Sequence, residues 1–108
     1  MVKQGDIIKL DFNPPSGREQ AGYRPAVVIS NDFFNARTNL TMVCPITNTR
    51  KPFPLHISLD DRTTTTGVVL CEHLKALDLN VRPYKVVERI PDDLLDEVIG
   101  TVFSEIER

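Results

Sequence analysis

The sequence predicts a mainly β, α+β protein: a small, curled antiparallel sheet or barrel capped by one C-terminal amphipathic helix. Short apolar runs, several of them alternating with polar residues, recur through residues 6–90 and are separated by turn-forming segments. From residue 91 onward, apolar residues recur at three- and four-residue spacing, which is the period of a helix. A chain of 108 residues suits one domain with one hydrophobic core, so we expect a single domain spanning 1–108.

The first two strands are predicted on either side of a long loop. Alternation of apolar and charged residues predicts a half-buried strand over 6–12. The loop that follows, 13–23, is longer than most hairpin loops, and such loops are often binding loops. The β-branched run 25–30 predicts a central strand, and we expect Pro25 at its first position because proline cannot donate to a ladder.

The middle of the chain predicts a series of shorter elements. Residues 31–39 predict a loop with a short helical turn, and residues 40–47 predict a strand. Further strand-like segments are expected at 55–59, 67–72, 74–77 and 84–90, with a basic turn at 48–52 and a polar loop at 60–66. Alternation within 55–59 places His56 on the solvent face of its strand.

The C-terminal segment predicts the helix. Pro91 suits its first turn, and Asp92 and Asp93 favour a helix N-terminus because their charges oppose the positive end of the helix dipole. We expect one apolar face of this helix to pack on the sheet; its members are Leu94, Leu95, Val98, Ile99, Val102, Phe103 and Ile106.

Charge and composition exclude several classes of function. The net charge of −2 argues mildly against a nucleic-acid partner, but residues 1–56 carry seven basic and four acidic side chains, which allows a locally basic surface. No apolar run has the length of a membrane span and residues 1–6 contain no apolar signal region, so we expect a cytoplasmic protein with no membrane partner. Phosphate-loop, dinucleotide-binding, nucleophile-elbow and metalloprotease motifs are absent, and we expect no cofactor.

The cysteines and histidines give only a weak argument for a metal. Cys44 and Cys71 lie in apolar strand-like runs, where buried, reduced thiols are expected. Two cysteines and two histidines are widely spaced along the chain, unlike the clustered ligands of zinc sites, so we expect no metal.

Arg24 and Thr47 stand where polar segments meet apolar strands. An arginine at the mouth of a buried strand needs a partner for its charge, which could be the carboxylate of Asp11 or Glu19, or a bound phosphate. The residues alone leave these alternatives about equally open. Thr47 ends an apolar strand in Pro-Ile-Thr, where its hydroxyl could cap the turn or hydrogen-bond a phosphate.

Further side chains could support binding of a polyanion. His56 and His73 are the groups whose ordinary pKa suits acid–base chemistry near neutral pH, although both could equally be structural or exposed histidines. Arg18, Arg50 and Lys51 could form a basic rim around Arg24. Four aromatic side chains could stack on unpaired bases: Tyr23, Phe33, Phe34 and Phe53.

These motifs together resemble those of the MazF/PemK (Kid) family of bacterial toxin endoribonucleases. The matching segments are Gly5-Asp6-Ile7, Asp11-Phe12-x-Pro14, Gly17-x-Glu19-Gln20-x-Gly22-x-Arg24-Pro25-x-Val27-Val28-Ile29-Ser30 and Pro45-Ile46-Thr47, with weaker matches at Gly67–Leu70, Leu77-Asp78 and Arg82. The resemblance runs in order through essentially the whole chain. The segment Glu-Gln-x-Gly-x-Arg-Pro before an apolar strand is its most specific part.

The resemblance implies a small SH3-like barrel of the PemK/CcdB type that works as a homodimer. It implies metal-independent cleavage of single-stranded RNA at short preferred sequences and inhibition by a cognate, MazE-like antitoxin. In this family the RNA's 2′-hydroxyl attacks the adjacent phosphate, which leaves a 2′,3′-cyclic phosphate and a 5′-hydroxyl. The arginine of the Arg-Pro motif and the threonine of Pro-x-Thr are the family's catalytic pair, which implies that Arg24 and Thr47 are catalytic here.

The resemblance also implies where RNA is bound. The expected RNA-binding residues are Arg18, Glu19, Gln20, Arg50, Lys51, His56 and His73. Arg18 departs from many members, which have serine at that position. His56 falls where some members place an RNA-contacting histidine, and His73 falls where some have glutamine, so the base preference is not carried over.

Two other functions compete with the ribonuclease hypothesis. One is a non-catalytic inhibitor of DNA gyrase on the same fold, as in CcdB toxins, which lack the Arg-Pro and Pro-x-Thr pair. The other is a plain SH3-like binding module in which Arg24 is only structural. In that case removing Arg24 would strand a buried carboxylate and destabilise the fold by about 3–5 kcal/mol.

Overall fold

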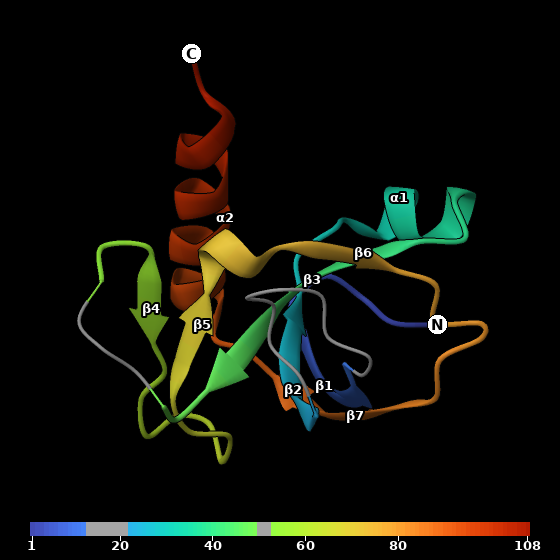
Figure 1. The fold of residues 1–108 in the computed structure, drawn as a ribbon, viewed down its shortest axis with the longest axis horizontal. Coiled ribbons are helices and arrows are strands. Elements are labelled where there is room, and N and C mark those ends of the chain that lie inside the picture. Colours follow the sequence, from blue (N-terminus) through green and yellow to red (C-terminus); the bar gives the residue numbers. More distant parts are fainter. Residues whose placement is uncertain (13–21, 50–52) are drawn as a thin grey trace.

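The computed structural model describes residues 1–12, 22–49 and 53–108 and contains an antiparallel sheet with a helix on one of its faces (Figure 1). The seven strands are β1 (Asp6–Asp11), β2 (Tyr23–Val28), β3 (Thr41–Thr47), β4 (His56–Ser58), β5 (Val68–Leu70), β6 (Lys75–Leu77) and β7 (Tyr84–Arg89). The helices are α1 (Asp32–Arg37), the 3₁₀ turn η1 (Cys71–His73) and α2 (Asp92–Ile106).

The strands follow the path β4-β5-β3-β2-β1-β7, and β6 also pairs with β3. Within the part of the chain that the structure describes, β4 and β7 end this path without pairing to each other, so the sheet is curled like a barrel but is not closed. Every strand pair is antiparallel. The predicted mainly β fold with a C-terminal helix is confirmed.

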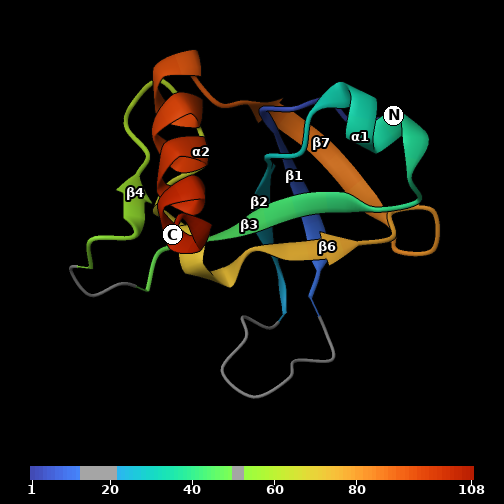
Figure 2. The same cartoon turned by 90° about the horizontal axis from the view of Figure 1, so that it is seen from above.

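Alternation along the strands divides the apolar residues between the two faces of the sheet. Ile7, Val27 and Cys44 belong to a core that α2 covers, and Val98 of α2 is fully buried in it. Ile8, Ala26 and Val43 belong to a second cluster that excludes α2. Figure 2 shows α2 along one side of the sheet and α1 at the other end of it. A site on the sheet face opposite α2 is therefore built on strands whose apolar side chains are buried.

The second strand differs from the prediction at both ends. β2 begins at Tyr23 and ends at Val28, so Pro25 is its third residue rather than its first. At this position β2 pairs with Lys9 of β1, whereas its pairing with β3 begins one residue later, at Ala26. The missing N–H of Pro25 therefore removes no bond from the β2–β3 ladder, which is why proline is tolerated there.

The C-terminal helix is where the sequence predicts it, but its last turns are more exposed than expected. Pro91 precedes the first turn, in which Asp92 lies 3.3 Å from Arg89. Leu94, Leu95, Val98 and Val102 are buried, as the helical spacing predicts. Phe103 and Ile106 are 61% and 70% exposed, because the end of the helix extends beyond the strands (Figure 1).

The remaining sequence predictions for the scaffold are largely confirmed. The predicted helical turn is α1, capped by Asn31, whose Oδ1 accepts a hydrogen bond from the Phe34 N–H at 2.8 Å. The strand expected over 67–72 ends at Leu70 and continues as the turn η1. Cys44 and Cys71 are buried free thiols. Burial raises the pKa of both thiols, that of Cys71 to about 12, so both are protonated and unreactive near neutral pH. None of the described helices is long and apolar enough to span a membrane.

Candidate active site

Arg24 and Thr47 lie at the same end of two paired strands. β2 pairs with β3 through Ala26↔Pro45 and the two pairs that follow, Val27↔Cys44 and Val28↔Val43. Arg24 lies two residues before Ala26 and Thr47 lies two residues after Pro45, so both stand just beyond the same end of this ladder. Because each is two residues from a member of the Ala26↔Pro45 pair, both side chains lie on that pair's face of the sheet, opposite α2.

The surroundings of Thr47 leave its hydroxyl hydrogen available to a ligand. Thr47 is only 7% exposed, and its Oγ1 accepts a hydrogen bond from the Thr49 N–H at 3.2 Å. That bond fixes the oxygen and orients the hydroxyl, which can still donate to a phosphate oxygen. Arg24 is half-buried and lies opposite Leu10 of β1, so the β1–β2 ladder holds its backbone.

A close backbone approach holds the strand end that carries Thr47. Gly67, just before β5, has φ +115°, and a Cβ added to it would lie 2.3 Å from the carbonyl oxygen of Thr47. Only glycine fits this contact and this left-handed backbone without strain. The segment before β5 therefore packs directly on the backbone of Thr47, and the Thr66 Oγ1 donates to Asn48 Oδ1 at 3.0 Å.

His56 is less exposed than the alternation in its strand predicts. Its side chain is 14% exposed, its Nε2 lies 2.8 Å from Glu72 Oε2, and its ring lies 5.1 Å from the ring of Phe53. The prediction of an ordinary solvent-facing histidine is therefore wrong, because Glu72 and Phe53 cover the ring. The Nδ1 atom is buried and has no hydrogen-bond partner within the described residues.

The histidines form a second group on the same side of the sheet. His73 Nε2 lies 3.9 Å from the Glu72 carboxylate that binds His56, so one carboxylate joins both rings. Ile57 packs on the core under α2, which places its strand neighbour His56 on the opposite face, that of Thr47. β4 is two strands from β3, about 10 Å away, which is beyond hydrogen-bond reach of Thr47. The two histidines therefore flank the Arg24–Thr47 pair rather than join it.

Several predicted site residues cannot be placed. Arg18, Glu19, Gln20, Arg50 and Lys51 lie outside the described residues. Of the aromatic candidates, Tyr23, Phe33 and Phe53 are exposed and Phe34 is half-buried. The Phe33 ring already lies 4.8 Å from the Arg37 guanidinium.

Sequence reasoning missed two features of this region. Glu72 is not among the predicted site residues, although it stands between a predicted strand end and His73, where a carboxylate can pair with a histidine. A polar cavity of about 340 Å³ was also missed; it is lined by Lys9, Pro25, Asn48, Thr64, Thr65, Thr66 and Val87. Its walls come from five separate segments, so no local pattern could have predicted it.

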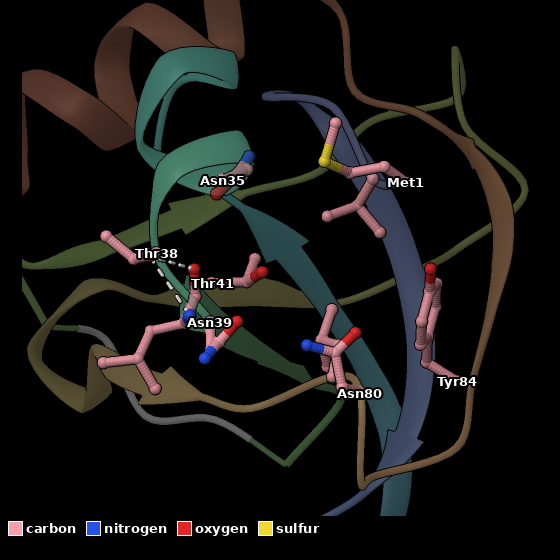
Figure 3. Close-up of a pocket in the computed structure, with 10 residues that line it drawn as sticks. Met1, Asn35, Thr38, Asn39, Thr41, Asn80 and Tyr84 are labelled. Carbon is pink, nitrogen blue, oxygen red and sulfur yellow. Dashed lines mark hydrogen bonds between the residues drawn. The ribbon is translucent and has the colours of Figure 1, made fainter.

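A second hollow lies at the opposite end of β3 and does not join the candidate site. It measures about 300 Å³ and lies between α1, the N-terminus and the segment after β6 (Figure 3). Thr41, which lines it, begins the strand that Thr47 ends, so the two lie about 20 Å apart. Among residues 1–12, 22–49 and 53–108, no three histidine, cysteine or acidic side chains come together as a metal site.

Comparison with known proteins finds similarity over most of the chain. A family described as the PemK-like, MazF-like toxins of type II toxin–antitoxin systems matches residues 3–102. The chain is similar to the endoribonuclease PemK of Escherichia coli, with 34% identity over 92% of this chain and 77% of that protein. It is also similar to the endoribonuclease toxin ChpB of Escherichia coli strain K12, with 34% identity over 97% of this chain and 94% of that protein.

Solved structures agree with these relatives. The crystal structure of MazF (Form-I) from Deinococcus radiodurans superposes with a TM-score of 0.92 and 34% identity, covering 99% of this chain and 97% of that one. A MazE–MazF crystal structure from the same organism matches with a TM-score of 0.83 and 31% identity over 98% of this chain and 95% of that one.

Proposed function

The chain belongs to the family of PemK-like, MazF-like toxins of type II toxin–antitoxin systems, and from this membership we propose that Arg24 and Thr47 cleave RNA in an endoribonuclease toxin. The observation that supports the assignment of these residues is that Arg24 and Thr47 lie just beyond the same end of the β2–β3 ladder, on one face of the sheet. A guanidinium and a hydroxyl so placed can bind the same phosphate. This arrangement favours a bound phosphate, rather than a carboxylate of the protein, as the partner of the Arg24 guanidinium.

The reaction needs charge stabilisation and proton transfer. The RNA 2′-hydroxyl loses its proton and attacks phosphorus, the bond from phosphorus to the 5′-oxygen breaks, and that oxygen takes up a proton. The products are a 2′,3′-cyclic phosphate and a 5′-hydroxyl. Arg24 neutralises the charge that grows on the non-bridging oxygens, and its planar fork matches their geometry. Thr47 donates its hydroxyl hydrogen to the phosphate, since its oxygen is already held by the Thr49 N–H.

The remaining predicted residues bind RNA around this pair. His56 and His73 lie on the flank, where they contact a neighbouring nucleotide rather than the scissile phosphate. Arg18, Glu19, Gln20, Arg50 and Lys51 belong to the two segments of sequence next to Arg24 and Thr47, and we assign them to RNA binding on that proximity. Residues 1–108 act as one toxin domain.

The partners follow from the same family. The substrate is single-stranded RNA, and a cognate MazE-like antitoxin inhibits the toxin; MazE–MazF complexes are among the similar structures. The working unit is a homodimer, and the site of action is the cytoplasm, where messenger RNA is found. Gyrase inhibition and plain binding, the alternative functions, do not use the Arg24–Thr47 pair.

One experiment tests this function. The purified chain is incubated with a long RNA in EDTA, and the new 5′ ends are mapped and tested for a hydroxyl. We expect cleavage at a short recurring sequence, with 5′-hydroxyl ends and no loss of rate in EDTA. No cleavage by a folded protein, combined with inhibition of gyrase, would instead assign the chain to the gyrase inhibitors.

A further inference from the structure

We propose that the polar cavity on the α2 side of the sheet is a separate binding site for a phosphorylated sugar, whose phosphate is held by Lys9 and Lys85. The cavity measures about 340 Å³, within the usual range of small-molecule sites, roughly 300–1,000 Å³. This site is additional to the RNA site and does not rest on the proposed ribonuclease function. The cavity is lined by Lys9, Pro25, Asn48, Thr64, Thr65, Thr66 and Val87.

Strand alternation separates this cavity from the catalytic pair. Lys9 stands two residues after Ile7, which belongs to the core under α2. Pro25 stands two residues before Val27, which belongs to the same core. Both lining residues therefore lie on the α2 side of the sheet, whereas the catalytic pair lies on the other face. A ligand in the cavity leaves the RNA face open.

Two lysines form the cationic side of the site. Lys9 stands directly opposite Lys85 in the β1–β7 ladder, so both side chains lie on the same face, where like charges destabilise a sheet. Within residues 1–12, 22–49 and 53–108, neither ammonium has a hydrogen bond or an ion pair. A phosphate bound by both ammonium groups removes their repulsion and supplies the acceptors that they lack.

Glu88 of β7 does not neutralise these lysines, because the threonine wall of the cavity uses its oxygens. Its carboxylate accepts four hydrogen bonds: from the Thr64 N–H at 3.0 Å, the Thr65 N–H at 2.7 Å, the Thr64 hydroxyl at 2.9 Å and the Thr65 hydroxyl at 2.6 Å. These bonds fix the loop before β5 on β7. Glu88 is thus a positioning residue for this wall, and the lysine charges are left to a ligand.

The same bonds determine what the wall can offer to a ligand. The hydroxyls of Thr64 and Thr65 give their hydrogens to Glu88. The hydroxyl of Thr66 gives its hydrogen to Asn48 Oδ1 at 3.0 Å. Each hydroxyl therefore presents only oxygen lone pairs, and the Asn48 amide presents its hydrogens. A sugar suits this wall, because each of its hydroxyls can donate to a threonine oxygen and accept from the amide.

Calorimetric titration of the purified chain tests the class of ligand. The probes are ribose 5-phosphate, adenosine 5′-monophosphate, inorganic phosphate and ribose, in a phosphate-free buffer of constant ionic strength. We expect ribose 5-phosphate to bind about tenfold more tightly than inorganic phosphate, because the sugar hydroxyls add hydrogen bonds, and ribose alone to show no binding. Equal affinity for ribose 5-phosphate and inorganic phosphate would overturn the proposal.

The adenosine 5′-monophosphate titration identifies the source of the phosphorylated sugar. Binding tighter than that of ribose 5-phosphate supports a mononucleotide, whose base packs on the apolar side chains of Pro25 and Val87. Weaker binding supports a free sugar phosphate. Both results retain the phosphate and sugar contacts that define the site.

Lysine variants test where the phosphate binds. Lys9→Met and Lys85→Met should each weaken binding of ribose 5-phosphate about tenfold, as loss of one hydrogen bond to a charged group does. Neither should lower the free energy of unfolding in phosphate-free buffer, because each removes the like-charge repulsion. Lys3→Met is the matched control and should bind as the wild type does, because Lys3 is exposed and does not line the cavity. Unchanged affinity in both cavity variants would overturn the proposal.

Two variants of Thr66 test the sugar contact. Thr66→Val should reduce the preference for ribose 5-phosphate over inorganic phosphate about threefold, because one acceptor is lost. Thr66→Ser keeps the hydroxyl and should keep the preference. A preference that survives unchanged in the valine variant would show that this wall does not bind the sugar.

A final comparison separates the cavity from the catalytic pair. Arg24→Ala removes the guanidinium from the RNA face, and a saturating 2′-O-methyl RNA occupies that face without being cleaved. We expect both to leave the binding of ribose 5-phosphate unchanged, because the cavity lies on the other side of the sheet. Loss of binding in Arg24→Ala, or displacement by the RNA, would place the sugar phosphate at the catalytic pair and overturn the proposal. If the chain cleaves no RNA, the proposed function fails, whereas the titrations of the lysine and threonine variants still decide the cavity.

Discussion

At the scale of single residues, the candidate site depends on how two side chains are held rather than on unusual chemistry. Thr47 is held by the Thr49 N–H and by the backbone contact with Gly67, and Arg24 is held by the pairing of β2 with β1, where it lies opposite Leu10. Neither needs a shifted pKa to act, because an arginine is always charged and a threonine always neutral near pH 7. Their positions should therefore matter more than the pH of the medium.

Replacing Arg24 tests whether its planar fork matters as well as its charge. Arg24→Lys should lower the single-turnover cleavage rate at least about 100-fold, because an ammonium cannot bind two phosphate oxygens in parallel. The measurement is cleavage of a fluorescent RNA at saturating enzyme. Arg37→Lys, an exposed change on α1, is the control and should keep the wild-type rate. Full activity in a folded Arg24→Ala variant would contradict the assignment.

Replacing Thr47 separates its hydroxyl from its shape. Thr47→Val should lower the cleavage rate by about 100-fold, as removal of a donor to a developing oxyanion does in other enzymes. It should also lower the free energy of unfolding by about 1 kcal/mol, because the Thr49 N–H loses its acceptor. Thr47→Ser keeps the hydroxyl and should retain most of the rate. Equal activity of the valine and serine variants would argue that the threonine only fills space.

At the scale of elements, the loop before β5 connects the outer edge of the sheet to the end of β3. Arg62 in this loop binds Asp60 and Asp93, each at 2.8 Å, and its hydrogen bonds lower the pKa of both carboxyls. Further along the same loop, Glu88 holds two threonines, and Gly67 contacts the Thr47 backbone. This one loop therefore links α2 and β7 to the end of β3 that carries Thr47.

The charge of Glu88 gives this loop a pH-dependent stability. Burial opposes ionisation of Glu88, but hydrogen bonds from Thr65 and Thr64 outweigh it and hold its pKa below the ordinary value. Because the folded pKa is the lower one, Glu88 stabilises the fold above the unfolded pKa, about 4.3, and this contribution is lost as pH falls through the folded value. Glu88→Gln should therefore lower the free energy of unfolding by about 1–2 kcal/mol at pH 7.

Urea unfolding at several pH values measures this effect. The difference between wild type and Glu88→Gln should shrink as the pH falls below about 4. Glu97→Gln is the control, because Glu97 is exposed on α2 and should show little difference at any pH. A gap between wild type and Glu88→Gln that persists unchanged at pH 3 would show that the carboxylate charge is not what holds the loop.

At the scale of the whole molecule, the charge is divided between the two halves of the chain. The N-terminal half, which contributes Arg24 and Thr47, is basic, whereas Asp92 and Asp93 begin α2, which covers the opposite face of the sheet. A protein with a net charge of −2 can therefore present a basic face to RNA.

Binding of RNA should accordingly weaken with salt despite the negative net charge. A fluorescent 2′-O-methyl RNA cannot attack its own phosphate, so it reports binding without cleavage. We expect the affinity, measured by anisotropy, to fall with salt with a log–log slope of about −2 to −4, as for three to five phosphate contacts. A slope near zero would mean that binding does not depend on phosphate contacts.

The sequence by itself determined which segments form strands and which form helices, because the spacing of apolar residues depends only on the local geometry of the backbone. It indicated the strands, the helical turn that became α1, the C-terminal helix, and Arg24 and Thr47 as residues at strand ends. The sequence could not decide whether the Arg24 guanidinium pairs with a carboxylate of the protein or with a bound phosphate, because the partner depends on which strand lies beside Arg24 in the fold.

Only the tertiary structure decided which distant residues meet. The β2–β3 ladder brings Arg24 and Thr47 to the same end of two neighbouring strands, the packing of Phe53 and Glu72 covers His56, and the β1–β7 ladder places Lys9 beside Lys85. The physical reason is that strand register and loop packing are set by contacts between segments far apart in the chain, which no local pattern records.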